Sequence, residues 1–317
     1  MAGTEVTRLI VPAAPRGSKV AVVSPGSYPQ EETLRAGVER LAALGFVPSI
    51  GRHTRSKAHG FFAGSESERL EDLHAAFADA EVRAIFCSRG GYGSNYLLRG
   101  LDLELIARNP KPLLGYSDLT CVQTWLLDRA GLIAFHGPMA AADFSAPEGV
   151  ETESLLAALQ GDAWSLGPES GLRALQPGRA AGVLYGGCLT VLAASLGTPY
   201  APQMAGKLLF LEDVGLKPYQ FDRLLRQMLL AGCFEETSGI VFGEMLHCIP
   251  EGRPPEYLDD IVRRVLRGFS GPIAMGLRSG HVSRRNATLA FGVRAALDLE
   301  GEPVLTFLER ATHPARG

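Results

Sequence analysis

The feature that most constrains the fold of this chain is the alternation of short apolar runs with segments of helical periodicity. The run at 20–24 (VAVVS) ends in Pro25-Gly26, and the apolar residues of 31–44 then recur at helical spacing and stop before Gly45. A β-branched run that ends in Pro-Gly indicates a strand and a turn. A glycine just beyond the periodic segment indicates the end of a helix.

The same alternation continues through the first half of the chain. Ser65 and Glu68 have the spacing of a capping box, which predicts the start of a helix at 65–80. We expect three further strands and two further helices here, at 84–88, 112–115, 133–136, 118–129 and about 151–159. Strands that alternate with helices predict a mostly parallel sheet covered on both faces. The predicted class is therefore α/β, with a Rossmann/flavodoxin-like parallel sheet.

A second α/β unit is predicted after a turn-rich segment. Gly167-Pro168 and Gln176-Pro177-Gly178 interrupt the pattern, and 317 residues are enough for about two domains. We expect an N-terminal domain at 1–165, a linker at 166–180 and a smaller, β-containing domain at 181–317. Its expected strands are 182–185, 207–212, 239–243, 273–275, 287–291 and 304–308, and its expected helices are 189–196 and 219–230.

The charge balance and hydropathy exclude several classes of function. Lys plus Arg is 31 and Asp plus Glu is 34, so the net charge is 31 − 34 = −3, which argues against sequence-independent binding of nucleic acid. No apolar run approaches the ~18 residues that a membrane span needs. Near the N-terminus, Glu5 and Arg8 interrupt the apolar residues and Pro12 follows. This is not a secretory signal, and we expect a cytoplasmic protein.

The cysteines and histidines do not predict a metal site. The five cysteines include no C-x-x-C pair, which argues against a disulfide framework and a thiolate zinc site. Their apolar neighbours predict small buried side chains. No two of the seven histidines have the spacing of a zinc hydrolase motif.

A glycine-rich loop follows the strand expected at 84–88. The segment 88–95 (SRGGYGSN) holds Gly90, Gly91 and Gly93, and glycines let backbone N–H groups approach an anion closely. The loop lacks the third glycine of a dinucleotide fingerprint, and the chain has no G-x-x-x-x-G-K. A tight strand-to-helix turn is the alternative.

Ser117 lies between an expected strand and an expected helix, in LLGYSDLT. This position is typical of a nucleophile elbow, and the helix N-terminus offers amides and a dipole to an oxyanion. The match to G-x-S-x-G is incomplete because Leu119 stands where the second glycine belongs. The alternative is that Ser117 only caps the helix.

An acid and a histidine follow Ser117 in the chain. Glu212 and Asp213 end a strongly apolar strand, and His281 stands in Ser279-Gly280-His281. Taken singly, the acids are compatible with capping and the histidine with a structural role. Together, Ser117, Glu212 and His281 have the order nucleophile, acid, histidine of α/β hydrolases. In such a set the histidine activates the serine, and the acid fixes the histidine tautomer.

The chain resembles the LD-carboxypeptidase family of serine peptidases, which includes muramoyltetrapeptide carboxypeptidases and microcin C immunity peptidases. The resemblance covers about 19–298 in family order. It rests on VAVVSPGS, SRGGYGSNYLL, LLGYSDLT, FHGPM, GGCLTVLAASLGTPY, LLFLEDVGLKPYQFDRLLRQM and GLRSGHVSRRNATLAFG.

The resemblance implies a Ser117-Glu212-His281 triad and an oxyanion hole made by the N–H groups of Gly91 and Asp118. It also implies an active site between two domains, no metal or organic cofactor, and a homodimer. The implied reaction releases a terminal D-amino acid, D-alanine, from a murein tetrapeptide in cell-wall recycling.

Two residues of the glycine-rich loop are expected to bind the substrate. Arg89 is suited to the substrate carboxylate, or it only braces the loop, and Tyr92 is the second. An alternative substrate is an aminoacyl nucleotide of the microcin C type, with Trp164 either stacked on the base or packed in the core. A non-catalytic wall-peptide binding module and a Rossmann-type nucleotide enzyme are the other hypotheses.

Overall fold

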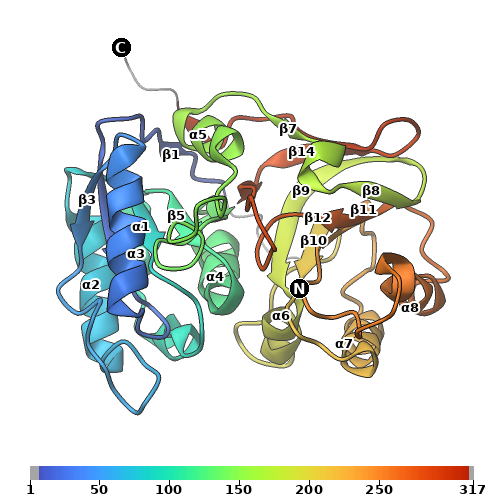
Figure 1. Ribbon diagram of the computed structural model, residues 1–317, viewed down its shortest axis with the longest axis horizontal. Coiled ribbons are helices and arrows are strands. Elements are labelled where there is room, and N and C mark those ends of the chain that lie inside the picture. Colours follow the sequence, from blue (N-terminus) through green and yellow to red (C-terminus); the bar gives the residue numbers. More distant parts are fainter. Residues whose placement is uncertain (1–6, 314–317) are drawn as a thin grey trace.

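The computed structural model describes residues 7–313. Figure 1 shows two halves side by side, with the N-terminal part of the chain in blue to green and the C-terminal part in yellow to red. One half is built around a six-stranded sheet and the other around an eight-stranded sheet. The α/β class predicted from the alternating pattern is confirmed.

The N-terminal half contains strands and helices in alternation. Its elements are β1 (Val11–Pro12), β2 (Lys19–Val23), α1 (Glu31–Ala43), β3 (Val47–Ile50), α2 (Glu66–Ala78), β4 (Val82–Cys87), η1 (Ser94–Arg99), α3 (Leu103–Arg108), β5 (Leu113–Gly115), η2 (Ser117–Leu119), α4 (Thr120–Ala130), β6 (Ala134–His136) and α5 (Thr152–Gln160).

The six-stranded sheet has the flavodoxin-like strand order. Its order is β13-β6-β5-β4-β2-β3, and β2 to β6 pair in parallel. In this order β2 lies next to β4, and the chain proceeds from β2 to one edge of the sheet and from β4 to the other. Ligands bind at such a switch point, beside the carboxyl ends of the strands. The loops after β4 and β5 lie at this edge, so the fold brings the glycine-rich loop and Ser117 to the same place.

The C-terminal half holds the longer sheet. Its elements are β7 (Ser165–Leu166), η3 (Pro168–Ser170), β8 (Arg173–Gln176), β9 (Arg179–Cys188), α6 (Leu189–Ser195), β10 (Leu208–Glu212), α7 (Pro218–Leu230), β11 (Gly239–Gly243), η4 (Pro255–Leu258), α8 (Asp259–Val265), β12 (Ile273–Leu277), β13 (Leu289–Phe291), β14 (Arg294–Asp298), β15 (Val304–Phe307) and β16 (Thr312–His313).

The eight-stranded sheet is parallel in its centre and antiparallel at its flanks. Its order is β7-β15-β14-β9-β10-β11-β12-β8. Strands β9 to β12 pair in parallel, whereas β8, β14, β15 and β7 join antiparallel. Glu212 is the last residue of β10, so it also lies at a carboxyl edge.

The C-terminal part of the chain contributes strands to the N-terminal half. Strand β13 comes from the C-terminal part of the chain but pairs antiparallel with β6 in the N-terminal sheet, and β16 pairs with β1. The segment predicted as a linker, 166–180, is not irregular: it contributes β8 and the start of β9 to the large sheet. The sequence pattern missed this because β8 is a four-residue strand without a buried face. The domain limits themselves stay a prediction.

Helix α4 is held against the C-terminal sheet at its first residue. The Thr120 hydroxyl accepts a hydrogen bond of 3.0 Å from the Cys188 amide at the end of β9. A Cβ on Gly187 would lie 2.6 Å from the Thr120 side chain, so only glycine permits this approach. The contact fixes the helix that follows Ser117 relative to the other half of the molecule.

Several local predictions are confirmed. Ser65 and Glu68 form the capping box at the start of α2. Gly45 follows the end of α1 with φ +95°. All five cysteines are free and buried. None of the described helices has the length and apolar character needed to cross a bilayer.

Candidate active site

Ser117 occupies a strained turn between β5 and the helix that follows. Its φ is +65°, in the left-handed region that residues with a side chain seldom adopt. Its hydroxyl caps no helix end and forms no hydrogen bond within residues 7–313. The alternative in which Ser117 serves as a helix cap therefore fails. The turn instead presents a free hydroxyl at the carboxyl edge of the sheet.

Ser117 and His281 line the same cavity. The cavity has a volume of about 330 Å³. Its lining comes from both halves of the molecule and comprises Gln30, Thr33, Arg89, Gly90, Gly91, Tyr116, Ser117, Met139, Ala141, Ala142 and His281. A Cβ on Gly90 would lie 2.8 Å from the Cβ of Ser117, so glycine is needed where this loop passes the serine.

The glycine-rich loop is held beside Ser117 by hydrogen bonds. The amide of Ser94 donates to the Asp118 carboxylate over 2.8 Å, and the amide of Tyr92 donates to the Ser27 hydroxyl over 3.1 Å. Gly91 has φ +92°. The amides of Gly91 and Asp118 donate to no other group in the part of the chain that the structure describes. These two N–H groups therefore remain available to a ligand.

Glu212 and His281 form a hydrogen-bonded pair. Glu212 is fully buried, and its Oε2 lies 2.8 Å from Nδ1 of His281. The same oxygen accepts the backbone N–H of His281 over 3.0 Å. A carboxylate bonded to Nδ1 selects the tautomer with the proton on that nitrogen, which leaves Nε2 as the base.

The electrostatics of this pair favour a charged carboxylate beside an imidazole that is ready to take a proton. Burial lowers the pKa of His281, but the charge and hydrogen bond of Glu212 outweigh it and hold that pKa above its usual value. Burial likewise raises the pKa of Glu212, and His281 reverses this, so the pKa of Glu212 is lowered. The arrangement stabilises an imidazolium formed at His281.

The neighbouring acid has a different role. Oδ2 of Asp213 accepts from the amide of Thr190 over 2.8 Å and from its hydroxyl over 2.6 Å. It therefore holds the first turn of α6. Of the acid pair seen in the sequence, the structure brings only Glu212 into contact with His281.

Of the two predicted substrate-binding residues, only Arg89 lines the cavity that contains Ser117. Arg89 lines the cavity, and within residues 7–313 it forms no ion pair. Tyr92 is 47% exposed and lies outside the cavity lining, with its ring centre 5.8 Å from that of Phe61 and 6.1 Å from that of Tyr96.

Trp164 belongs to the core. It is 9% exposed and stacks on Phe307, with ring centres 3.9 Å apart and planes at 18°. It faces a different cavity from the one that Ser117 lines. Of the two alternatives for Trp164, the structure supports packing in the core, and its ring does not line the Ser117 cavity.

Three buried residues near the site were not singled out as functional from the sequence. Tyr116 packs edge-on against His281 with ring centres 5.0 Å apart. Asp143 and Asn286 are joined by a 2.9 Å hydrogen bond, although 143 positions separate them in the chain. The only available signal was the adjacency of Tyr116 to Ser117 and of Asn286 to the Ser279-Gly280-His281 turn.

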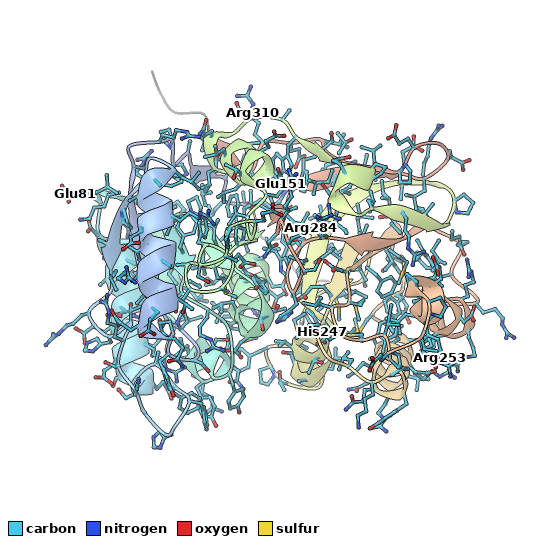
Figure 2. All side chains as sticks on the ribbon, viewed as in Figure 1. Glu81, Glu151, His247, Arg253, Arg284 and Arg310 are labelled. Atoms are coloured by element: carbon cyan, nitrogen blue, oxygen red, sulfur yellow. The ribbon has the colours of Figure 1, made fainter. Side chains whose placement is uncertain are left out.

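Figure 2 shows where the two halves meet. Glu151 and Arg284 lie near the middle of the view, whereas Glu81 and Arg253 mark opposite outer ends. Arg285, next to Arg284, lies 3.7 Å from the Glu151 carboxylate. The loop that carries His281 therefore rests on the N-terminal half.

Comparison with known proteins agrees with this architecture. Residues 20–137 match the model of the LD-carboxypeptidase N-terminal domain, and residues 181–297 match that of the LD-carboxypeptidase C-terminal domain. A probable murein peptide carboxypeptidase of Bacillus subtilis is 34% identical over 89% of each chain. The murein tetrapeptide carboxypeptidase of Pseudomonas aeruginosa is 34% identical, over 90% of this chain and 94% of its own.

Solved structures have the same fold. The muramoyltetrapeptide carboxypeptidase of Oxalobacter formigenes is 25% identical, with a TM-score of 0.80 over 94% of this chain and all of that one. The microcin C7 self-immunity protein MccF is also 25% identical, with a TM-score of 0.87 over 96% of this chain and all of that one.

The fold, the sequence relatives and the residues at the cavity define a serine-type peptidase, a hydrolase. Both domain models of the family match in order, and two putative carboxypeptidases are identical to this chain at more than a third of the aligned positions. These matches identify the family of peptidases. The chain belongs to the LD-carboxypeptidase family.

Proposed function

We propose that this protein is an LD-carboxypeptidase that releases the terminal D-alanine of murein tetrapeptides during cell-wall recycling. The observation that carries the proposal is the buried Glu212–His281 hydrogen bond at a cavity that also contains the free hydroxyl of Ser117. A base held in one tautomer and a serine on a strained turn are the parts that acyl transfer through an acyl-enzyme requires.

The proposed reaction has two stages. Nε2 of His281 takes the proton of the Ser117 hydroxyl while Oγ attacks the carbonyl carbon of the scissile amide. The C–N bond then breaks, and the imidazolium gives its proton to the leaving amine, which departs as the D-amino acid. A water molecule, deprotonated in turn by Nε2, attacks the ester carbonyl. The bond from this carbonyl to Oγ of Ser117 then breaks, Oγ takes the proton back from the imidazolium, and the shortened peptide leaves with a new carboxylate. Glu212 stays ionised throughout and stabilises the imidazolium.

We assign the oxyanion hole to the amides of Gly91 and Asp118. Both belong to segments that pass Ser117, and both N–H groups lack an acceptor within residues 7–313. Loss of one such donor costs roughly 10²–10³ in rate in comparable sites. The hole would hold the negative charge that develops on the carbonyl oxygen.

Arg89 is proposed to bind the carboxylate of the terminal D-residue. Its side chain lines the cavity and lacks an acidic partner within residues 7–313, and guanidinium binds carboxylate through two parallel hydrogen bonds. Tyr92 is proposed to contact the substrate at the cavity rim, because it follows Gly91 directly and its ring is exposed.

The test is release of free D-alanine from a panel of murein tetrapeptides that differ in the third residue. The wild type is expected to release D-alanine, and Ser117→Ala is expected to release none above background while keeping its fold. Ser195→Ala, which removes a hydroxyl bonded within α6, is the matched control and should retain full activity. Absence of D-alanine from every peptide would contradict the proposal.

A second substrate class is favoured by one group of relatives. The microcin C7 self-immunity protein MccF of Escherichia coli is 25% identical over 89% of this chain, and one MccF structure contains adenosine monophosphate. The same enzyme should therefore be offered an aminoacyl-sulfamoyl adenosine. Cleavage of this compound with a kcat/KM above that for every tetrapeptide would assign the microcin-type activity instead.

The predicted cytoplasmic location and homodimer are part of the proposal. Fractionation of the source cell and sedimentation of the purified protein are the measurements that decide them. A monomer at micromolar concentration, or activity found outside the cytoplasm, would require a revised account.

A further inference from the structure

Asp143 is a buried carboxylate that contacts groups from both halves of the molecule. Its Oδ2 accepts the amide of Met139 over 2.8 Å. Its Oδ1 accepts from Nδ2 of Asn286 over 2.9 Å and from the Tyr116 hydroxyl over 3.4 Å. No Lys, Arg or His within residues 7–313 forms an ion pair with it. Its three donors are all neutral.

Asn286 connects this carboxylate to the turn that carries His281. Its side chain is fully buried. Its Nδ2 donates to the Gly280 carbonyl over 3.0 Å, and its Oδ1 accepts the Gly280 amide over 3.0 Å. Asn286 thus holds both backbone groups of the residue that immediately precedes His281.

The turn at Gly280 passes very close to Glu212. Its φ is +88°, and a Cβ there would lie 2.6 Å from the carboxyl carbon of Glu212. The turn passes directly over the acid that binds His281, so a small displacement of Gly280 shifts the imidazole relative to Glu212. The backbone of Asn286 is itself fixed, since its amide donates to the Gly149 carbonyl over 2.8 Å.

The third contact of Asp143 leads to the serine. Tyr116 immediately precedes Ser117, and its ring packs at 90° to the imidazole of His281. One carboxylate therefore contacts both the residue before Ser117 and the side chain that holds the residue before His281. No other hydrogen bond of the described residues links these two turns through a single group.

The burial of Asp143 is costly for stability. Burial raises the pKa of this carboxyl to about 6 against the lowering effect of its hydrogen bonds. A buried carboxylate without a cationic partner opposes folding. Buried charged groups that lower stability occur mainly at functional sites, so Asp143 is a candidate for a role in this one.

We propose that Asp143 and Asn286 form a positioning pair that sets the imidazole of His281 against Ser117 across the two halves of the molecule. The proposal rests on the proposed function, because it assigns these residues a role in the same site. Neither residue is catalytic: Asp143 acts through Asn286 and Tyr116, and Asn286 acts through Gly280.

The test compares Asp143→Asn, Asn286→Asp and the double variant that exchanges the two residues. Asn286→Asp removes both N–H donors and places two carboxylates face to face, so kcat should fall about 100-fold, as expected for a misplacement of about 1 Å. In Asp143→Asn the kcat should fall about 10-fold. In the exchanged pair an amide at 143 again donates to a carboxylate at 286, but the Gly280 carbonyl still lacks its donor. The kcat should therefore recover in part, at least 10-fold from that of Asn286→Asp. KM should change by less than about 3-fold in all three.

Asp128→Asn is the matched control. Asp128 is also a largely buried carboxylate that links the two halves, since it accepts from the Tyr185 hydroxyl over 2.8 Å, but it does not contact the His281 turn. Its kcat should stay within about 3-fold of the wild type. If Asn286→Asp lowers only the unfolding midpoint and leaves kcat unchanged, as is expected of Asp128→Asn, the pair is merely structural and the proposal is overturned.

A second readout does not depend on the substrate. The Nδ1–H proton of His281, hydrogen-bonded to Glu212, should give a low-field proton resonance that broadens in Asn286→Asp and returns in the exchanged pair. Failure of the wild type to cleave any tetrapeptide would contradict the proposed function, and this resonance would still decide the positioning role. An unchanged resonance in Asn286→Asp would overturn that role even in an active enzyme.

Discussion

At the scale of single residues, the site combines backbone strain with buried charge. Ser117 adopts a positive φ although it is not glycine, and Glu212 is ionised without any exposure to solvent. Both features are unfavourable for an isolated residue. Favourable interactions in the rest of the fold must offset both costs.

The strain at Ser117 predicts an unusual order of stability. Ser117→Gly and Ser117→Ala should both abolish turnover, because each removes the hydroxyl. The glycine variant should nevertheless be the more stable of the two by about 1 kcal/mol, since alanine keeps the unfavourable left-handed conformation. Urea unfolding of both variants measures the difference. At positions with negative φ, alanine gives a more stable protein than glycine. If Ser117→Ala is more stable than Ser117→Gly, the turn is unstrained and this prediction is wrong.

The Glu212–His281 bond predicts the pH dependence of activity. His281 must be neutral to act as a base, so kcat/KM should rise with pH through a pKa above the usual value for histidine. Glu212→Gln removes the charge that raises this pKa, so the acid limb should move to lower pH. The rate at neutral pH should fall by about 10⁴, as in other triads that lose their acid.

Asp213→Asn is the control for the Glu212 variant. Asp213 is adjacent in sequence, but its carboxylate accepts hydrogen bonds from Thr190 and Val214 and not from His281. The charge of Asp213 also raises the pKa of His281, though less than Glu212 does. The Asp213→Asn variant should therefore move the acid limb to lower pH by less than Glu212→Gln does, and it should lose far less activity. An acid limb that stays in place in Glu212→Gln would refute the role assigned to the carboxylate.

At the scale of elements, helices with strong end signals and strands with continuous apolar runs were predictable. The capping box located α2, and the run KLLFLE located β10. The strand β3 was missed because its sequence VPSI contains a proline, which an edge strand tolerates. Short elements such as β8 and α8 were missed because four to seven residues carry too little periodicity.

Helix α1 contains a glycine that its packing requires. A Cβ on Gly37 would lie 1.7 Å from the carbonyl oxygen of Ala140. Alanine normally stabilises a helix interior by about 1 kcal/mol relative to glycine. Here Gly37→Ala should instead lower the free energy of unfolding, by about 1–3 kcal/mol. It should also lower kcat, since Met139 and Ala141 on either side line the cavity.

Denaturant unfolding and steady-state kinetics of Gly37→Ala test this prediction. Ala42→Gly, at an exposed position of the same helix, is the control and should cost no more than about 1 kcal/mol without an effect on kcat. A stabilised Gly37→Ala protein would contradict the close approach of α1 to this segment.

At the scale of the whole molecule, the two halves depend on each other. The C-terminal segment supplies β13 to the N-terminal sheet and β16 to β1. Without them, β6 would become an unprotected edge strand of the sheet that carries Ser117. The active cavity likewise takes its lining from both halves.

The contribution of β13 to the N-terminal sheet predicts that a fragment of residues 1–165 does not fold alone. It should show no cooperative urea transition and should aggregate on size-exclusion chromatography, because β6 has lost its partner. Mixing it with the fragment 166–317 during refolding should restore a cooperative transition. A sharp, reversible transition of the first fragment by itself would show that the half-sheets are autonomous and would support the predicted domain limits.

The sequence by itself determined the α/β class, most of the longer strands and helices, and a serine, an acid and a histidine in the order of a hydrolase. These features are encoded locally, in hydrophobic periodicity, end signals and short motifs. Only the tertiary structure decided that Trp164 packs in the core, that β13 completes the other sheet, and that Asp143 contacts Asn286. Such contacts join residues far apart in the chain, and the packing of the whole fold selects them.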